Sequence, residues 1–212
     1  MLDHGLPTDG RREISMKKVA AWLAIGLVSS PIGVAPMPGL AQGATPLPAR
    51  ENPIKPEKNP PGDIPDNQVF IDYQSPLGFT IKVPEGWARR EASDSVVFSD
   101  KYNTIELTVA QRAGSIDLNN VKQKEVADLE RSGKAVRVSS VKPTSLPSGS
   151  AIVVSYGSNS EPNAVTNKAV RLENERYFFW KDGKLVTLTL SAPFGADNAD
   201  QWLLMAKSFR WR

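Results

Sequence analysis

The sequence predicts an α+β fold in which helices pack on a largely antiparallel sheet. Three observations lead to this class. Apolar residues alternate with polar ones in many short runs, turns rich in Gly, Pro and Asp separate these runs, and two segments change to the helical period of about 3.6 residues. The 212 residues contain no internal repeat.

The clearest strand is residues 78–83, which read GFTIKV. Alternation places its side chains on two faces: Phe79, Ile81 and Val83 on one, Thr80 and Lys82 on the other. Pro84 ends the strand because it has no N–H to donate. Gly86 can adopt a positive φ in the following turn, and Trp87 then begins the next strand.

The other strands predicted from alternation or apolar runs are residues 69–73, 87–91, 95–99, 104–110, 135–141, 150–156, 168–180 and 185–190. Residues 177–180 are four consecutive aromatics, so they place two rings on each face of their strand. This predicts a covering layer on both sides of the sheet at that end. Asp182-Gly183 predicts a tight hairpin between the last two strands.

Residues 115–132 and 198–209 are the two predicted helices. The first has an apolar stripe of Leu118, Val121, Val126 and Leu129, and the second one of Trp202, Leu203, Met205, Ala206 and Phe209. Asp117 or Ser115 can cap the start of the first helix, and Gly133 is placed for a left-handed C-cap. The candidate caps of the second helix are Asn198 and Asp197.

Residues 1–43 are predicted to be an N-terminal extension and an export signal, with Lys17 and Lys18 before the ten-residue apolar core 19–28. This core is too short for a membrane span of about 20 residues. Met16 is a second candidate start, and twin-arginine export is a weaker alternative because residues 13–15 continue the Arg pair poorly. The expected location is therefore extracytoplasmic, either periplasmic or secreted.

Residues 44–67 contain seven prolines and few large apolar groups. They predict an extended, semi-rigid spacer before a domain at residues 68–212, or merely a disordered mature N-terminus. As a tether it would need an uncleaved signal, because the chain has no cysteine to carry a lipid. Membrane association through that signal is thus one open alternative.

The residue types present exclude several chemistries. The chain has no cysteine, and its one histidine, His4, precedes everything that is predicted to fold. Disulfides, thiolate metal sites and Cys-His or Ser-His-Asp catalysis are thereby excluded. After residue 43 there remain 22 basic and 20 acidic residues, a balance that argues against nucleic acid as a partner. We predict no enzyme, no cofactor and no metal.

Acidic residues give the remaining candidate sites. Asp94, Asp100 and Glu106 lie on or beside adjacent predicted strands, where paired carboxylates could do acid–base work or hold a hard cation, but turn capping and a solvated face are favoured. For Asp197 and Asp200 a helix N-terminus is favoured over a Ca²⁺ loop. The set Arg171, Glu173 and Glu175 is interpreted as an exposed ion-pair row.

Serine and aromatic residues complete the candidates. The pairs and runs at Ser139-Ser140 and residues 148–150 have no base to activate a nucleophile. Three aromatics are assigned to the core and not to a ligand platform: Trp87, Phe98 and Trp180. Trp211, beyond the last helix, is the better candidate for a contact surface.

The block GFTIKVPEGW (residues 78–87), followed by VVFSD (residues 96–100), resembles the PsbP-like family, which shares its fold with Mog1. The terminal hairpin, the Ser-Ala-Pro turn at residues 191–193 and the Ser-Phe end at residues 208–209 are similar as well. The resemblance implies an α/β/α sandwich with a central, largely antiparallel sheet flanked by helices. It also implies an extracytoplasmic location. The chain lacks the lipobox cysteine and the metal-binding histidines of other members.

These observations predict an exported, non-enzymatic PsbP-like protein that binds a protein partner at the cell envelope. One alternative is a carrier of a small molecule or lipid in a groove between sheet and helix. Another is an extrinsic or assembly factor of a photosynthetic complex. The partner, the oligomeric state and the fate of the signal stay open.

Overall fold

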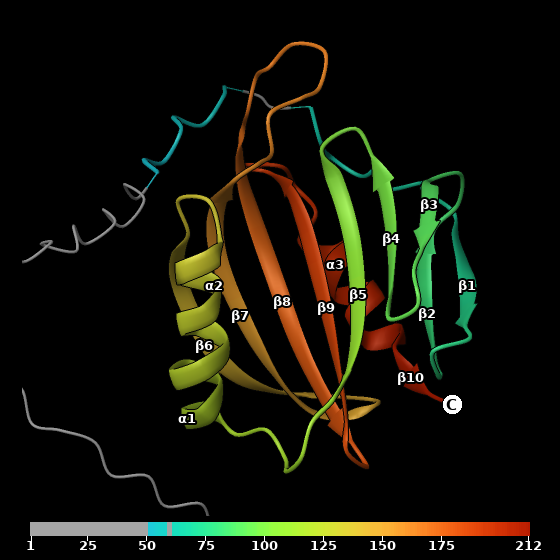
Figure 1. Ribbon diagram of the computed structural model, residues 1–212. Helices are drawn as coiled ribbons and strands as arrows, with labels where there is room; N and C mark the ends of the chain where they lie inside the picture. Colours follow the sequence, from blue (N-terminus) through green and yellow to red (C-terminus); the bar gives the residue numbers. More distant parts are fainter. Residues whose placement is uncertain (1–50, 59–60) are drawn as a thin grey trace, which may run out of the picture. The chain divides into compact units, whose positions relative to one another are not determined.

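The computed structural model describes residues 51–58 and 61–212. The described residues lie in one compact unit, which Figure 1 shows as a strongly twisted sheet with helices on it. The predicted export signal lies outside the described residues. So does the first part of the Pro-rich segment.

Seven strands form the main sheet, in the order β3-β4-β5-β9-β8-β7-β6, and all neighbours are antiparallel. Their bounds are β3 (Ala88–Glu91), β4 (Ser95–Asp100), β5 (Asn103–Gln111), β6 (Arg137–Leu146), β7 (Gly149–Asn159), β8 (Arg171–Lys181) and β9 (Lys184–Pro193). A second sheet has the order β1-β2-β10, from β1 (Phe70–Ser75), β2 (Phe79–Pro84) and β10 (Arg210–Trp211). Each predicted strand is present, with its ends moved by a few residues.

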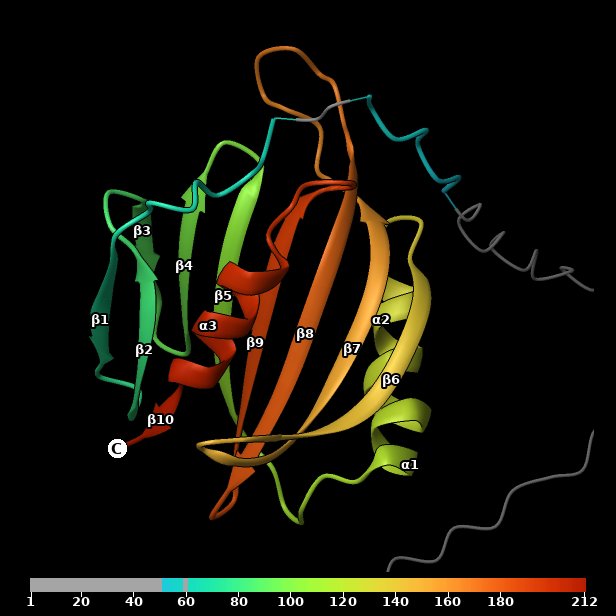
Figure 2. The same ribbon diagram turned by 180° about the vertical axis from the view of Figure 1, so that it is seen from behind.

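Helices cover opposite faces of the main sheet, which confirms the α+β class and the α/β/α arrangement. Figure 1 shows α1 (Leu118–Asn120) and α2 (Ala127–Ser132) in front of β6 and β7, and Figure 2 shows α3 (Ala199–Ser208) on the other side, over β5 and β9. Helices are the minor part of the fold. Two apolar cores result, one on each side of the sheet.

The four aromatics at the end of β8 divide between the two cores as predicted. Tyr177 and Phe179 belong to the α3-side core, while Phe178 belongs to the other core and Trp180 packs against it. On the α3 side, Phe209 stacks between Phe179 and Phe79, with ring centroids 4.2 and 5.7 Å away. This column of rings joins the small sheet to the large one.

Turn chemistry matches the sequence at two turns. Asp182 and Gly183 have φ values of 49° and 80°, the two positive angles of a type I′ turn. Gly86 has φ of 86° after β2 ends at Pro84, as predicted. β6 runs five residues beyond its predicted end, through Pro143. Since β6 is an edge strand paired only with β7, a residue without an N–H can be accommodated there.

The first predicted helix is present but not regular. Asp117 caps it, with its Oδ1 accepting from the backbone N–H groups of Asn119 and Asn120 at 2.8 and 2.9 Å. A π-helical segment, η1 (Val121–Val126), interrupts it. The wider turn brings two valines five residues apart closer to one face than an α-helix would.

The predicted left-handed cap at Gly133 is wrong, because this glycine is extended, with φ −85° and ψ 153°. A side chain is excluded there for another reason. A Cβ at Gly133 would lie 2.4 Å from Cγ2 of Val136 and 2.7 Å from the carbonyl oxygen of Leu129. Close packing, not a positive φ, therefore explains the glycine.

In α3 the apolar stripe is confirmed for Trp202, Met205, Ala206 and the following Phe209, which are all buried. Leu203 was assigned to the stripe but is 40% exposed. Asn198 occupies the N-cap position as predicted, yet its side chain makes no capping hydrogen bond. It is bonded to another segment of the chain.

Candidate functional site

A groove of about 480 Å³ lies over β7 and β8 on the α3 side of the main sheet. The helix α3 itself lies over β5 and β9 (Figure 2). The groove begins at the N-terminal end of α3 and reaches the edge strand β6. Its lining residues are Arg137, Ser139, Ser155, Tyr156, Gly157, Arg171, Glu173, Asn174, Glu175, Phe194, Ala196, Asp197, Asn198, Ala199 and Trp202. The volume falls in the range of small-molecule sites.

Two carboxylates form the floor of the groove. Glu173 and Glu175 alternate with Asn174 on β8, so both point to the α3 side, as Tyr177 does. The hydroxyl of Tyr177 donates to Oε2 of Glu175 at 2.5 Å. Both glutamates are half-buried, and neither forms an ion pair within the part of the chain that the structure describes.

Arg171 corrects the predicted exposed ion-pair row. It is buried, with 8% exposure, and its Nη1 donates to the carbonyl oxygen of Ala135 at 2.8 Å and to Oδ1 of Asn159 at 3.2 Å. A Cβ at Gly157 would lie only 2.5 Å from Nη2 of Arg171. The guanidinium thus lies over a glycine of β7. The ion-pair row was mispredicted because the spacing of residues along β8 does not show that the neighbouring strand has a glycine at this point.

Burial perturbs the charged groups of the groove. Desolvation raises the pKa of Glu173, and the charge of Glu175 adds to this, while the backbone N–H groups of Gly195 and Ala196 lower it in part. Desolvation lowers the pKa of Arg171, helped by the like charge of Arg137. Perturbed groups in a cleft are a common mark of a functional site.

The walls of the groove differ in character. Phe194, Ala196 and Trp202 make an apolar wall on the side of α3, and Phe194 is 45% exposed. Arg137 and Ser139 form the opposite wall on β6, next to an irregularity in its pairing between Val138 and Ser140. The groove therefore offers charged groups below and an apolar surface at one side.

Two buried asparagines attach the Pro-rich segment to the rest of the compact unit. Asn159 accepts from the N–H of Ile54 at 3.0 Å and donates to Oε1 of Glu51 and the carbonyl of Asn52, both at 2.9 Å. Asn198 accepts from the N–H of Ile64 at 2.6 Å and donates to the carbonyl of Gly62 at 2.9 Å. Ile64 itself is a core residue.

These contacts were not predicted. The described part of the segment, which its composition marks as a spacer, is hydrogen-bonded along the unit. The one usable signal in the sequence was Ile64, an apolar residue between prolines.

The structure does not bring Asp94, Asp100 and Glu106 together. Asp94 precedes β4 and Asp100 ends it, so about 20 Å of strand separates them. Glu106 pairs with Val97 in mid-strand. Among the described residues no group of three or more acidic or His side chains could hold a metal ion. Asp200 lies in the first turn of α3 and Asp197 just before it, as the helix-start interpretation predicted.

The aromatic candidates lie mostly inside. Phe98 is buried, while Trp87 and Trp211 are partly buried against the same core. Trp211 makes an edge contact with Phe209, with ring centroids 5.2 Å apart. Its surface is therefore smaller than the sequence suggested.

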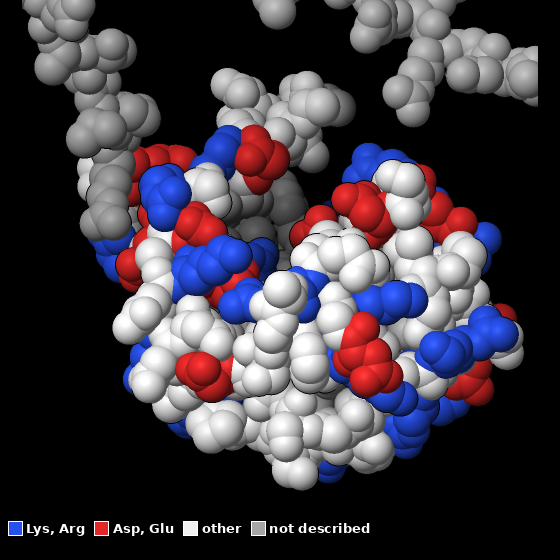
Figure 3. Space-filling view, turned by 60° about the horizontal axis from the view of Figure 1, so that its bottom comes forward, with Lys and Arg blue, Asp and Glu red and all other residues white. Residues whose placement is uncertain are grey.

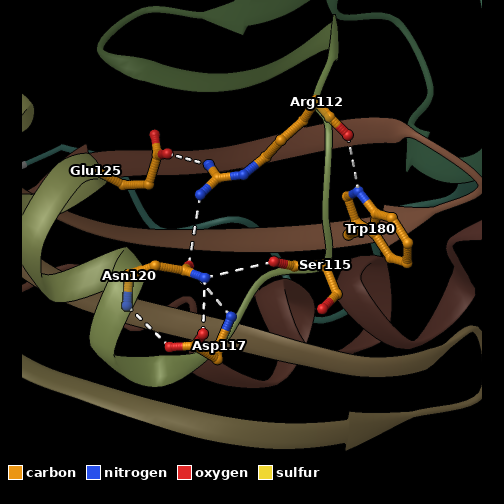
Figure 4. Close-up of polar contacts among 6 residues, drawn as sticks. All are labelled: Arg112, Ser115, Asp117, Asn120, Glu125 and Trp180. Carbon is orange, nitrogen blue, oxygen red and sulfur yellow. Dashed lines mark hydrogen bonds and ion pairs between the residues drawn. The ribbon is translucent and has the colours of Figure 1, made fainter.

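Trp180 takes part in a polar cluster at the start of α1 (Figure 4). Its Nε1 donates to the carbonyl of Arg112 at 3.3 Å, and the guanidinium of Arg112 pairs with Glu125. Asn120 accepts from Nη2 of Arg112 at 3.4 Å and donates to Oδ2 of Asp117 at 2.8 Å. These groups satisfy one another, so the cluster fastens the helix to β5 and β8.

Figure 3 shows Lys and Arg side chains interleaved with Asp and Glu over the lower face of the molecule. This face offers no continuous basic surface of the kind that binds nucleic acid. In the part of the chain that is described, no helix has the length and apolar character to cross a membrane.

Comparison with known proteins gives weak likenesses. The chain is similar to the solution structure of cyanobacterial PsbP from Synechocystis, at 15% identity and TM-score 0.49 over 71% of this chain and 98% of that one. It is also similar to a Bacteroides thetaiotaomicron protein, at 11% identity and TM-score 0.45 over 66% of this chain and 48% of that one. A third similar structure is a Pseudomonas aeruginosa protein of unknown function, at 11% identity and TM-score 0.41 over 63% of this chain and 91% of that one. No protein-family model and no curated protein matches.

Similarity at these TM-scores assigns the chain neither to a family nor to a function. The fold rests on its own strand order and helix placement, and PsbP-like membership stays a prediction from the sequence motifs.

Proposed function

We propose that this protein is an exported, non-enzymatic binding protein of PsbP-like type whose ligand site is the groove beside α3. The observation that carries the site is the carboxylate pair of Glu173 and Glu175. Half-buried charges without a counter-charge are costly in the folded state. A ligand that supplies the counter-charge offsets that cost, which is a physical reason for binding there.

The groove favours a polar ligand over a lipid. Between the sheet and α3 the space is filled by Trp202, Met205 and Ala206, all buried. The open part has a charged floor, on which an acyl chain would desolvate Glu173 and Glu175 without compensation. Of the two carrier alternatives, the geometry supports the small molecule. Export rests on the sequence pattern of residues 17–43.

Native mass spectrometry of the full chain, purified gently from its own cells, tests this function. We expect a bound small molecule in the wild type and its loss in the double variant Glu173→Gln, Glu175→Gln. Glu130→Gln, an exposed change on α2, is the matched control and should keep the ligand. Equal ligand occupancy in the double variant and the control would contradict the groove as the site.

A second candidate function is binding of a protein partner, and a different surface supports it. Leu203 and Leu204, 40% and 41% exposed, lie side by side on the outside of α3, beside Lys82 and Lys207. A photo-crosslinking residue at position 203 should give an adduct in intact cells, whereas the same residue at Val165, which is 91% exposed, should not. Equal adducts from both positions would argue against a specific partner. The identity of the adduct also tests the photosynthetic alternative.

A further inference from the structure

We infer that the groove binds a free α-amino acid with an apolar side chain. The inference rests on the proposed function of the groove and adds the chemical class of its ligand. In this arrangement the ligand's carboxylate lies on Arg137 and Arg171. Its ammonium group lies on Glu173 and Glu175, and its side chain lies against Phe194 and Trp202.

The guanidinium end has donors to offer. Arg171 uses Nη1 for Ala135 and Asn159, while its Nε and Nη2 have no acceptor among residues 51–58 and 61–212 and lie over Gly157 in the groove lining. Arg137 is exposed beside it. Two guanidiniums close enough to affect one another suit a shared carboxylate, which accepts several N–H donors at once.

The carboxylates of the groove argue against a simple anion as the ligand. Glu173, Glu175 and Asp197 line the groove with Arg137 and Arg171, so three negative charges face two positive ones. An anion bound at the arginines alone would also face these carboxylates. A ligand that carries an ammonium group next to its carboxylate matches both ends.

Both charged ends lie within reach of one small ligand. Arg137 pairs with Gly157, which pairs with Glu173, so their backbones are two strand spacings apart, about 10 Å. Both side chains line the same groove, so a guanidinium and a carboxylate can contact the two charged groups of one zwitterion.

The apolar wall gives the side-chain preference. Phe194 and Trp202 flank the floor at the start of α3, and the groove volume of about 480 Å³ leaves room for a branched or aromatic side chain. Burial of such a side chain against two aromatic rings is favourable. A charged ligand side chain would lose its hydration at this wall without gaining a polar partner.

Calorimetric titration with L-leucine, N-acetyl-L-leucine and L-leucinamide tests the inference. The two analogues remove the positive and the negative charge of the ligand in turn. We expect leucine to bind the wild type at least about tenfold more tightly than either analogue, because each analogue loses charge-assisted hydrogen bonds at one end. Arg137→Gln should weaken the preference over leucinamide, with Arg171 still present, and Glu173→Gln should weaken the preference over N-acetyl-leucine, with Glu175 still present. Glu130→Gln should keep both preferences.

Three results would overturn it: no heat of leucine binding at millimolar concentration, equal binding of the three compounds, or tighter binding of leucyl-leucine than of leucine. Circular dichroism shows that each variant is folded before titration. A different small molecule found by mass spectrometry, and lost in the groove variant, would overturn this inference while leaving the proposed function in place.

Discussion

Replacing Asn198 by Ala should lower the free energy of unfolding by about 1.5–4.5 kcal/mol. The side chain of Asn198 is 2% exposed and bonds the N–H of Ile64 and the carbonyl of Gly62. Ile64 is buried, so its stranded N–H costs about 1–3 kcal/mol. The half-buried carbonyl adds about 0.5–1.5 kcal/mol. No capping energy is lost, because Asn198 makes no capping bond.

Urea unfolding followed by tryptophan fluorescence measures this change. Asn119→Ala, an exposed amide at the start of α1, is the matched control and should change stability by less than about 0.5 kcal/mol. Asn198→Asp keeps an acceptor for the N–H of Ile64 and should fall between wild type and Asn198→Ala. If Asn198→Ala were no more destabilising than the control, the contact with residues 62–64 would not stabilise the fold, and the reasoning would be refuted.

Two further predictions follow from the cores and the groove. Phe209→Ala should cost about 3–5 kcal/mol in urea unfolding because it removes the ring between Phe79 and Phe179; a loss below about 1 kcal/mol would contradict the ring column. The folded state raises the pKa of Glu173 above its usual 4.5, so this carboxyl group keeps its proton to higher pH in the native protein than in the unfolded chain. The free energy of unfolding therefore falls as pH rises from the pKa of Glu173 in the unfolded chain through its pKa in the folded protein. Glu173→Gln should flatten this part of the stability–pH curve, and an unchanged slope would count against the burial argument.

The strands were predictable because alternation is a local property. Phe79, Ile81 and Val83 alternate with polar residues, and their exposed fractions of only 0, 1 and 2% follow directly. The Asp182-Gly183 turn was predictable for the same reason, since its two positive φ values require these residue types. Sequence reasoning succeeded wherever a short segment determines its own conformation.

The groove could not be predicted because it depends on which strands are neighbours. The spacing of Arg171, Glu173 and Glu175 gave the shared face correctly. It did not show that Gly157 on β7 lies opposite Glu173 and leaves the floor open for a guanidinium. The attachment of residues 51–54 and 62–64 was missed for a related reason, since composition alone does not show that Asn159 and Asn198 form hydrogen bonds with these residues.

One row of side chains on β8 connects the core to the site. Along the α3 side it reads Arg171, Glu173, Glu175, Tyr177 and Phe179. The two aromatics are buried in the α3-side core, and the three charged residues line the groove. The row therefore changes from apolar residues, which pack in the α3-side core, to charged residues where the groove opens. Had this face been needed only for stability, apolar residues at 173 and 175 would avoid the desolvation of two carboxylates. The charges at these positions are consistent with binding, because a ligand is what can offset the cost of holding them there.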